Sequence, residues 1–196
     1  MIPTLTTERL TLRAPRASDI DAFAAFRASK QMAHLGGPID RAAAWHQLTG
    51  IAGQWMLRGY GRWIVTLTGD DRPLGLVGLY HPDDWPAPEI GWSVFAEAEG
   101  RGIAHEAALA ARAFAYDRLG WTTVMSLIAD GNTRSIALAK RLGCTADGSF
   151  DHATYGAMTI WRHPAPRSHL AENTAGESGL PDGGSAPSPH ATGGAA

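Results

Sequence analysis

The chain has 196 residues, with 17 Lys and Arg against 19 Asp and Glu, and its one cysteine is Cys144. This near-balance of charge argues against a nucleic-acid binder, which gains most of its affinity by neutralising phosphates, and one cysteine excludes an internal disulfide and a cysteine-based zinc site. The start, MIPTLTTERL, lacks the basic end and apolar run of a signal peptide, and no apolar stretch is long enough to span a membrane. We therefore expect a soluble, cytoplasmic protein with neither nucleic acid nor membrane as a partner.

The composition changes at residue 164. Of the 33 residues from Pro164 to Ala196, 22 are Gly, Pro, Ser or Ala, and none is aromatic. A segment so poor in large apolar side chains buries too little surface to offset its ordering entropy. We predict one domain over residues 1–163, long enough to bury a core, and a disordered tail over residues 164–196.

The first part of the domain predicts a strand and two helices. Alternating apolar and polar residues predict a half-buried strand around Leu10 and Leu12. The cluster around Ser18 and Asp19 predicts the start of a helix, because such side chains satisfy free amide donors. Asp40 predicts the cap of a second helix that Gly59 ends. Its apolar residues, placed in the core, recur every three or four positions: Trp45, Leu48, Ala52 and Trp55.

The rest of the domain alternates strands and helices. A period of two predicts a hairpin over 62–68 and 74–80, then a strand over 89–94 with Ile90, Trp92 and Val94 on one face. Further on, the pattern predicts a helix from the 99–104 loop to about 119, a strand at 122–128, a helix at 132–142, and strands at 146–150 and 154–162. This order predicts a mixed α/β fold with about four helices, neither doubly wound nor all-β.

A strand, a glycine-containing loop and a helix form the most informative segment, EIGWSV followed by AEAEGRGIAHEA. Gly100 and Gly102 permit a tight turn that presents amide donors at a helix N-terminus, where phosphate is attracted. The alternative is a loop that needs glycine only for its turn. The segment is not a dinucleotide fingerprint, because His105 stands where a third glycine belongs, and no Walker sequence follows.

A second segment, ADGNTRSIALAKRLGC, follows about thirty residues later and places Asn132 and Ser135 around a short helix. The two segments in this order resemble the GNAT superfamily of N-acetyltransferases, most nearly its RimJ/RimL-type branch, which begins much like TERLTLRAPRASD. The resemblance covers residues 5–163. It implies a twisted, mostly antiparallel mixed sheet that is splayed between the Glu89 strand and the 122–128 strand, with acetyl-CoA in the gap.

The resemblance also implies cofactor-binding roles. The family pattern Q/R-x-x-G-x-G/A begins at Glu99, which departs from the usual Gln or Arg and would repel a pyrophosphate unless it turned away. The residues whose amides are implied to hold the pyrophosphate of acetyl-CoA are Gly100, Arg101, Gly102, Ile103 and Ala104. Asn132 and Ser135 are implied to lie beside the pantetheine arm, although either can serve as a helix cap. The candidates for the 3′-phosphate, or for a solvated helix face, are Arg134, Lys140 and Arg141.

Acetyl transfer to an amine needs a base and a way for the thiolate to leave. The resemblance places Glu89 beside the amine site, where it can act as a general base directly or through water; the alternative is an exposed carboxylate at a strand end. Many relatives carry a tyrosine acid where this chain has Ala139, so Ser135, or else Tyr155, is the candidate to assist thiolate departure. An α-amine costs only ~1 kcal/mol to deprotonate at pH 7, against ~4.6 kcal/mol for lysine, which favours a protein N-terminus or a small-molecule amine.

The sequence thus predicts an acetyl-CoA-dependent N-acetyltransferase without a metal. His105 and Glu106 form half of an H-E-x-x-H motif, but Leu109 replaces its second histidine. Cys144 is interpreted as a small buried residue rather than a nucleophile. The alternatives are a non-catalytic acyl-CoA-binding module, favoured by Ala139 and Glu99, and an interaction domain that binds no CoA. The sequence leaves the acceptor and the oligomeric state open.

Overall fold

The computed structural model describes residues 1–34 and 36–166, and its compact unit runs from Met1 to Pro166. Most of the predicted tail, from Arg167 on, lies outside the described residues. Eight strands form one sheet in the order β1-β2-β3-β4-β5-β6-β8-β7. The strands are β1 (Leu5–Thr6), β2 (Leu10–Arg13), β3 (Arg62–Leu67), β4 (Gly75–Tyr80), β5 (Glu89–Val94), β6 (Met125–Ala129), β7 (Thr145–His152) and β8 (Gly156–Arg162).

The sheet is splayed between β5 and β6. Every other neighbouring pair is antiparallel, whereas β5 and β6 run parallel and share a single register pair, Glu89 with Met125. Side chains satisfy main-chain groups beyond that pair: Ser126 Oγ donates to the Ile90 carbonyl at 2.6 Å, and the Leu127 N–H donates to the Glu89 carboxylate at 2.8 Å. The strands can therefore separate without leaving these buried groups unpaired. The predicted splayed, mostly antiparallel sheet is confirmed.

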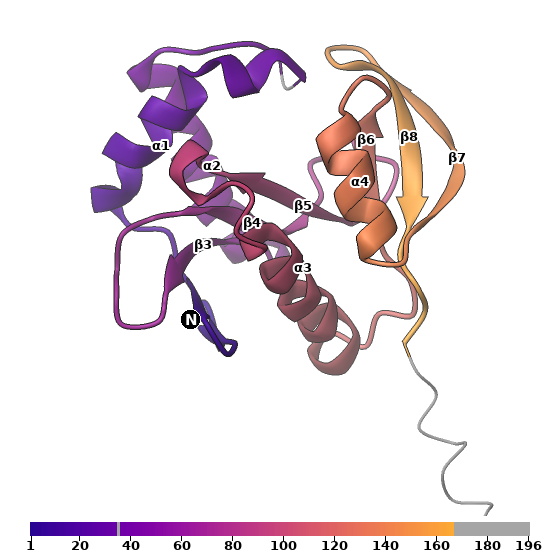
Figure 1. Ribbon diagram of the computed structural model, residues 1–196, viewed down its shortest axis with the longest axis horizontal. Coiled ribbons are helices and arrows are strands. Elements are labelled where there is room, and N and C mark those ends of the chain that lie inside the picture. The colour runs from indigo at the N-terminus through magenta and orange to yellow at the C-terminus, as the bar shows by residue number, and fades with distance from the viewer. Residues whose placement is uncertain (35, 167–196) are drawn as a thin grey trace, which may run out of the picture. The chain divides into compact units, whose positions relative to one another are not determined.

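Four α-helices flank the sheet: α1 (Ile20–Arg27), α2 (Arg41–Arg58), α3 (Ile103–Ala113) and α4 (Thr133–Arg141). Figure 1 shows α1 and α2 with β3–β5 on one side of the splay and α4 with β6–β8 on the other. The predicted ends of α2 are confirmed, because the Asp40 side chain accepts the Ala43 N–H at 2.8 Å and Gly59 adopts a left-handed φ of 74°.

Alternating residues of the strands enter two different cores. On β3, Trp63 and Val65 join the cluster that includes α3, whereas Ile64 packs with α1 and α2. The prediction that Ile90, Trp92 and Val94 share a face of β5 is confirmed, because all three pack into or against the α3 cluster. Residues of opposite parity, Arg62 and Glu89 among them, therefore belong to the α1/α2 face.

The sequence-based prediction for Trp45 was wrong, whereas that for Asp19 is confirmed. Trp45 is 42% exposed rather than in the core, because the buried stripe of α2 passes through Ala44, Leu48, Ile51 and Trp55, one position away. Asp19 lies at the start of the first helix, as predicted, and its carboxylate is buried. It is 1% exposed and accepts two hydrogen bonds from the Arg13 guanidinium, at 2.9 and 2.7 Å, as well as the Arg16 N–H. The carboxylate thus anchors the first helix to β2.

Candidate active site

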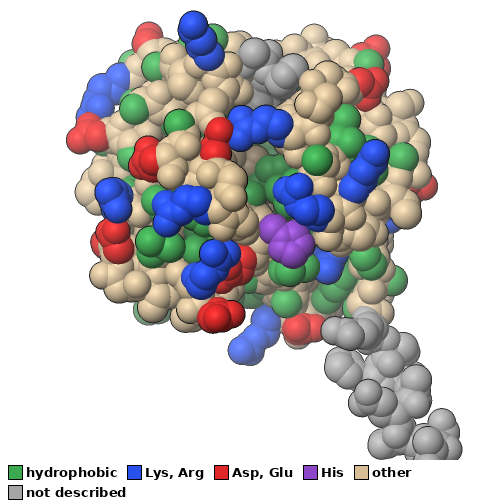
Figure 2. Space-filling model, in the orientation of Figure 1, with side chains coloured by type: hydrophobic (Ala, Val, Ile, Leu, Met, Phe, Trp, Pro, Cys, Tyr) green, Lys and Arg blue, Asp and Glu red, His purple; other side chains and the backbone are tan. Residues whose placement is uncertain are grey.

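The splay opens a cleft of about 630 Å³. Its walls come from α1, α2, the inner strands β3–β6, the 80–85 segment and the start of α4. Figure 2 shows a hollow near the middle of the face on which α3 and α4 lie, with Lys and Arg side chains around it. Of the predicted site residues, Glu89, Asn132 and Ser135 line this cleft. The 100–104 loop is not part of its lining.

Glu89 is the buried carboxylic acid of the cleft. Its side chain lies at the start of β5, and the residue is 7% exposed, so it is not the exposed strand-end carboxylate of the alternative interpretation. Burial raises the pKa of Glu89 to about 7, although the Leu127 N–H and the charge of Arg62 favour the ionised form. A carboxyl with this pKa is a proton acceptor of useful strength near neutral pH.

Ser135 and Asn132 form a small polar group at the start of α4. Asn132 Oδ1 accepts the Ser135 N–H at 3.2 Å and so caps the helix. The Ser135 hydroxyl accepts a hydrogen bond from the Trp92 indole at 3.2 Å, across the splay from β5. Because that hydroxyl acts as an acceptor there, its own proton is free to be donated into the cleft. Capping and a role in the site are compatible for both residues.

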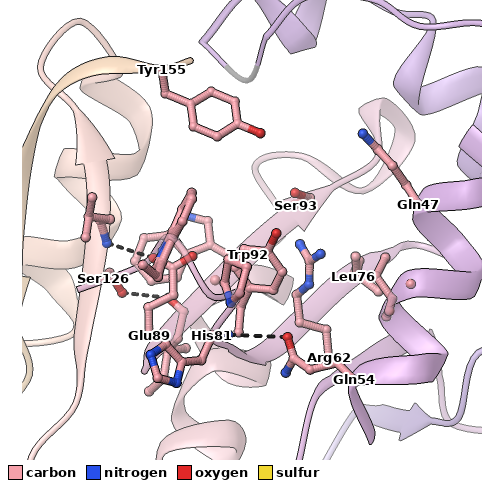
Figure 3. A pocket seen from close by; sticks show the side chains of 18 of the residues that line it. Gln47, Gln54, Arg62, Leu76, His81, Glu89, Trp92, Ser93, Ser126 and Tyr155 are labelled. Atoms are coloured by element: carbon pink, nitrogen blue, oxygen red, sulfur yellow. Dashed lines mark hydrogen bonds between the residues drawn. The ribbon is translucent and has the colours of Figure 1, made fainter. Parts of the chain in front are cut away.

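Tyr155 reaches the cleft from the turn between β7 and β8, and its hydroxyl points into the open space (Figure 3). The ring stacks on the buried imidazole of His152 at 4.6 Å between centroids. His152 Nδ1 accepts the N–H groups of Thr154 and Tyr155, and Nε2 lies 3.0 Å from an Asp84 carboxylate oxygen. This imidazole therefore holds the turn that carries Tyr155 against the 81–88 loop.

The 100–104 loop has the backbone geometry that its glycines allow. Gly100 and Gly102 have φ values of 72° and 77°, in the left-handed region that other residues rarely adopt. Gly102 is the N-cap of α3 and offers no side chain to its first turn, so N–H groups of that turn lack intrahelical partners. Arg9 holds the loop in place, because Nη1 donates to the Arg101 carbonyl at 3.2 Å while the guanidinium pairs with Glu106 at 2.6 Å. Such a set of donors fits a phosphate group.

Glu99 does not turn to solvent. Its Oε1 lies 2.6 Å from the Arg134 guanidinium and also accepts a hydrogen bond from the Gln31 side chain. The negative charge next to the loop is thereby paired, which reduces its repulsion toward an anion. Because Arg134 is engaged with Glu99, it contributes less to any phosphate site than its sequence position suggests.

Two arginines on the α1/α2 side of the cleft were not predicted. Arg27 is 8% exposed at the end of α1, and the Arg62 guanidinium lies 4.2 Å from the centre of the Tyr80 ring. Both line the cleft with Glu89. Periodicity in the sequence could have placed both arginines on a core-facing side. Arg27 follows the buried Phe23 by one helical turn, and Arg62 is two residues from the buried Ile64 and so lies on the same face of β3.

A family model described as an acetyltransferase (GNAT) domain matches residues 9–145. The chain belongs to the GNAT acetyltransferase family. The matched range contains both of the segments on which the resemblance was based. The family assignment also agrees with the splayed sheet.

Solved structures of GNAT proteins and other acetyltransferases share the fold. An acetyltransferase from Agrobacterium tumefaciens is 34% identical, with a TM-score of 0.77 over 84% of this chain and 95% of its own. A GNAT-family protein from Bordetella pertussis is 25% identical, with a TM-score of 0.71 over 83% and 99% of the two chains. RimL, a ribosomal L7/L12 α-N-protein acetyltransferase solved in complex with coenzyme A, is 16% identical, with a TM-score of 0.64 over 82% and 97%.

Glu106 and Cys144, which the sequence analysis considered for a metal site and for a nucleophile, have structural roles in this GNAT domain. Glu106 accepts hydrogen bonds from Thr7 and Arg9 and so joins α3 to the first strands. Burial raises the pKa of Cys144 to about 11, which does not suit a nucleophile.

No group of three His, Cys, Asp or Glu side chains within residues 1–34 and 36–166 is placed to hold a metal ion. In the same residues, no helix is both long and apolar enough to cross a membrane.

Proposed function

We propose that this GNAT protein transfers the acetyl group of acetyl-CoA directly to a primary amine within a ternary complex. The observation that carries the proposal is the buried carboxyl of Glu89, with a pKa of about 7, in a cleft whose opposite wall presents Asn132 and Ser135. A base and a hydroxyl donor thus border one space from the two sides of the splay, as a transfer between two bound substrates requires.

The 100–104 loop is the proposed pyrophosphate site. Its unpaired amides and left-handed glycines support contact through the backbone of Gly100, Arg101, Gly102, Ile103 and Ala104. Asn132 and Ser135 line the cleft, and Arg134 between them pairs with Glu99 beside the loop, so the proposal places the pantetheine arm along these residues. When bound, acetyl-CoA supplies a thioester carbonyl for attack by the amine.

In the proposed reaction, Glu89 takes a proton from the acceptor ammonium, directly or through one water. The freed nitrogen lone pair forms the new C–N bond at the thioester carbon, and the C–S bond breaks. Ser135 or Tyr155 donates a hydrogen bond to the departing sulfur, which leaves with the electron pair of the C–S bond. The attacking nitrogen then loses its second proton to this thiolate, so the products are a neutral amide and the free thiol. A thiolate with pKa near 8.5 leaves at a cost of only about 2 kcal/mol at pH 7, so a weak donor suffices and the lack of a tyrosine at Ala139 is tolerable.

The acceptor proposed is a protein N-terminal α-amine or a small-molecule amine, as in the RimJ/RimL-type branch. An α-amine costs ~1 kcal/mol to deprotonate at pH 7, so transfer of its proton to a carboxylate of pKa about 7 is only slightly uphill. The RimL structure, named as an α-N-protein acetyltransferase, has the same fold. The cleft of about 630 Å³, which α1 and α2 line on one side, has room for a peptide end or a small molecule.

The test is release of free thiol from acetyl-CoA by the full chain, measured over a panel of amino-terminal peptides, lysine derivatives and small amines. We expect turnover of at least one α-amine well above the rate without acceptor, and loss of that turnover in Glu89→Gln. Binding of acetyl-CoA without turnover would instead support the non-catalytic acyl-CoA-binding module. Absence of any CoA binding would leave the interaction domain.

A further inference from the structure

Arg27 and Arg62 are cleft-lining cations that form no salt bridge with any described residue, and the Glu89 carboxylate acts on Arg62 only from a distance. Among residues 1–34 and 36–166, no carboxylate oxygen lies within 4.0 Å of either guanidinium. Arg27 Nε is buried with no hydrogen-bond partner in this part of the chain, and Nη1 contacts only the thioether of Met32. Arg62 lies over the Tyr80 ring at 4.2 Å. Neither contact replaces the hydration that a guanidinium loses on burial.

Placing both cations in the same cleft adds to the free-energy cost of folding. Burial lowers the pKa of each arginine; for Arg62, Tyr80 and Glu89 oppose this lowering, whereas the positive charge of Arg27 adds to it. Arginine nevertheless stays charged in proteins, so the pair places positive potential inside the cleft. By contrast, the buried Arg13 of the same chain is matched by Asp19 at 2.7 Å. Arg27, which is buried, and Arg62, which is half-buried, have no such match, and both lie at the candidate active site.

Their position separates them from the proposed pyrophosphate site, although they share the cleft with Asn132 and Ser135. Arg62 pairs with Gly78, and Tyr80 pairs with Glu89, so side chains of Arg62, Tyr80 and Glu89 leave the same face of the sheet. That face packs against α1, the helix that carries Arg27, whereas the 100–104 loop opens α3 on the opposite face. In Figure 3 the guanidinium of Arg62 and the hydroxyl of Tyr155 point into the same open space.

We propose that the acceptor amine also carries an oxyanion, a carboxylate or a phosphate, which Arg27 and Arg62 bind while Glu89 receives the proton of the amine. This inference rests on the proposed function. The planar fork of arginine matches such oxyanions with two parallel hydrogen bonds. The substrate thus delivers the counter-charge that the folded chain lacks. Neutral amines of the same size leave both guanidinium groups unpaired, and the site discriminates against them.

The experiment compares matched acceptors that differ only at the oxyanion. The pairs are glutamate α-amide with glutamine α-amide, 4-aminobutyrate with its amide, and 2-aminoethylphosphate with ethanolamine. The full chain, Arg62→Met and Arg27→Met are assayed for kcat/KM with each acceptor and for the KM of acetyl-CoA. Arg72→Met is the control, because it removes one positive charge from an exposed hairpin turn, where Arg72 pairs with Asp70.

We expect at least one anionic acceptor to exceed its neutral partner about 10- to 100-fold in kcat/KM, as charge-assisted bonds give. The ratio should fall toward one in both arginine variants and stay unchanged in Arg72→Met. Equal rates for all matched pairs in the unmodified chain would overturn the inference while leaving acetyl transfer intact. A raised KM for acetyl-CoA with an unchanged acceptor ratio would also overturn it, because the arginines would then bind the cofactor.

Calorimetric titration of the same probes onto the CoA-saturated chain separates the two proposals. If no amine is acetylated but the anionic probes bind, and this binding is lost in Arg62→Met, the oxyanion site stands and the proposed function fails. If no probe binds and none is acetylated, both fail.

Discussion

The unmodified chain should lose stability as the pH rises from 5 to 8, whereas Glu89→Gln should not lose this contribution. The same substitution should remove activity. The carboxyl of Glu89 is 7% exposed, and burial raises its pKa from an ordinary 4.5 to about 7. The native state therefore binds this proton more tightly than the unfolded state does. Its contribution to stability is fully present below about pH 4.5 and is lost as the pH rises through about 7.

The size of the effect follows from the two pKa values. At 1.36 kcal/mol per tenfold change in proton affinity, raising the pH from 5 to 8 removes about 2.5 kcal/mol of unfolding free energy through Glu89 alone. Glutamine keeps the shape of the side chain and can still accept the Leu127 N–H, but it does not titrate. For a domain of this length, about 2.5 kcal/mol corresponds to roughly 5–10 °C in the unfolding midpoint.

The assay is thermal unfolding of both proteins at pH 5, 6, 7 and 8, with Glu8→Gln as a control that removes an exposed carboxyl. The midpoint of Glu89→Gln should gain on that of the unmodified chain between pH 5 and 8, whereas Glu8→Gln should track the unmodified chain. In parallel, kcat/KM should rise with pH through about 7 and fall by about 10²- to 10⁴-fold in Glu89→Gln. Midpoints that keep a constant difference across this range would refute the raised pKa.

Two further predictions concern sulfur departure and stability. Ser135→Ala should lower kcat about 10-fold or more if this hydroxyl assists the thiolate, with Tyr155→Phe close to unchanged; the reverse pattern in steady-state kinetics would assign the role to Tyr155. Asp19→Asn should destabilise the fold by about 3 kcal/mol because it leaves the buried Arg13 without its main partner. Asp21→Asn, which removes an exposed pair with Arg41, should cost under about 1 kcal/mol in the same denaturant titration.

Local patterns were sufficient to predict most of the fold. The alternation at Leu10 and Leu12 and the caps at Asp40 and Gly59 gave the right elements, because each depends on neighbours in the chain. Periodicity alone could not predict which of two adjacent residues of α2 faces the sheet, so Trp45 was misplaced. The short strand Leu5–Thr6 was missed because two residues give no period to detect.

Only part of the candidate site could be predicted from the sequence. Backbone-based features, such as the glycine loop and the Asn132 cap, are encoded locally and were found. The partners of Glu99 and the neighbours of Glu89 come from distant parts of the chain and depend on the splay of the sheet. Arg62 shows the same difficulty: an arginine in a strand is ordinarily assigned to solvent, and its partial burial follows only from the packing of α1 and α2.

The central claim is tested most directly by thermal unfolding of the full chain with and without acetyl-CoA, beside the variant Gly102→Val. At 100 times its dissociation constant a ligand adds about 2.7 kcal/mol, or roughly 5–11 °C in the midpoint. Valine at Gly102 is strained at a φ of 77°, so the account predicts this shift in the unmodified chain and its loss in a variant that still folds. No shift at millimolar acetyl-CoA in the unmodified chain would contradict the account.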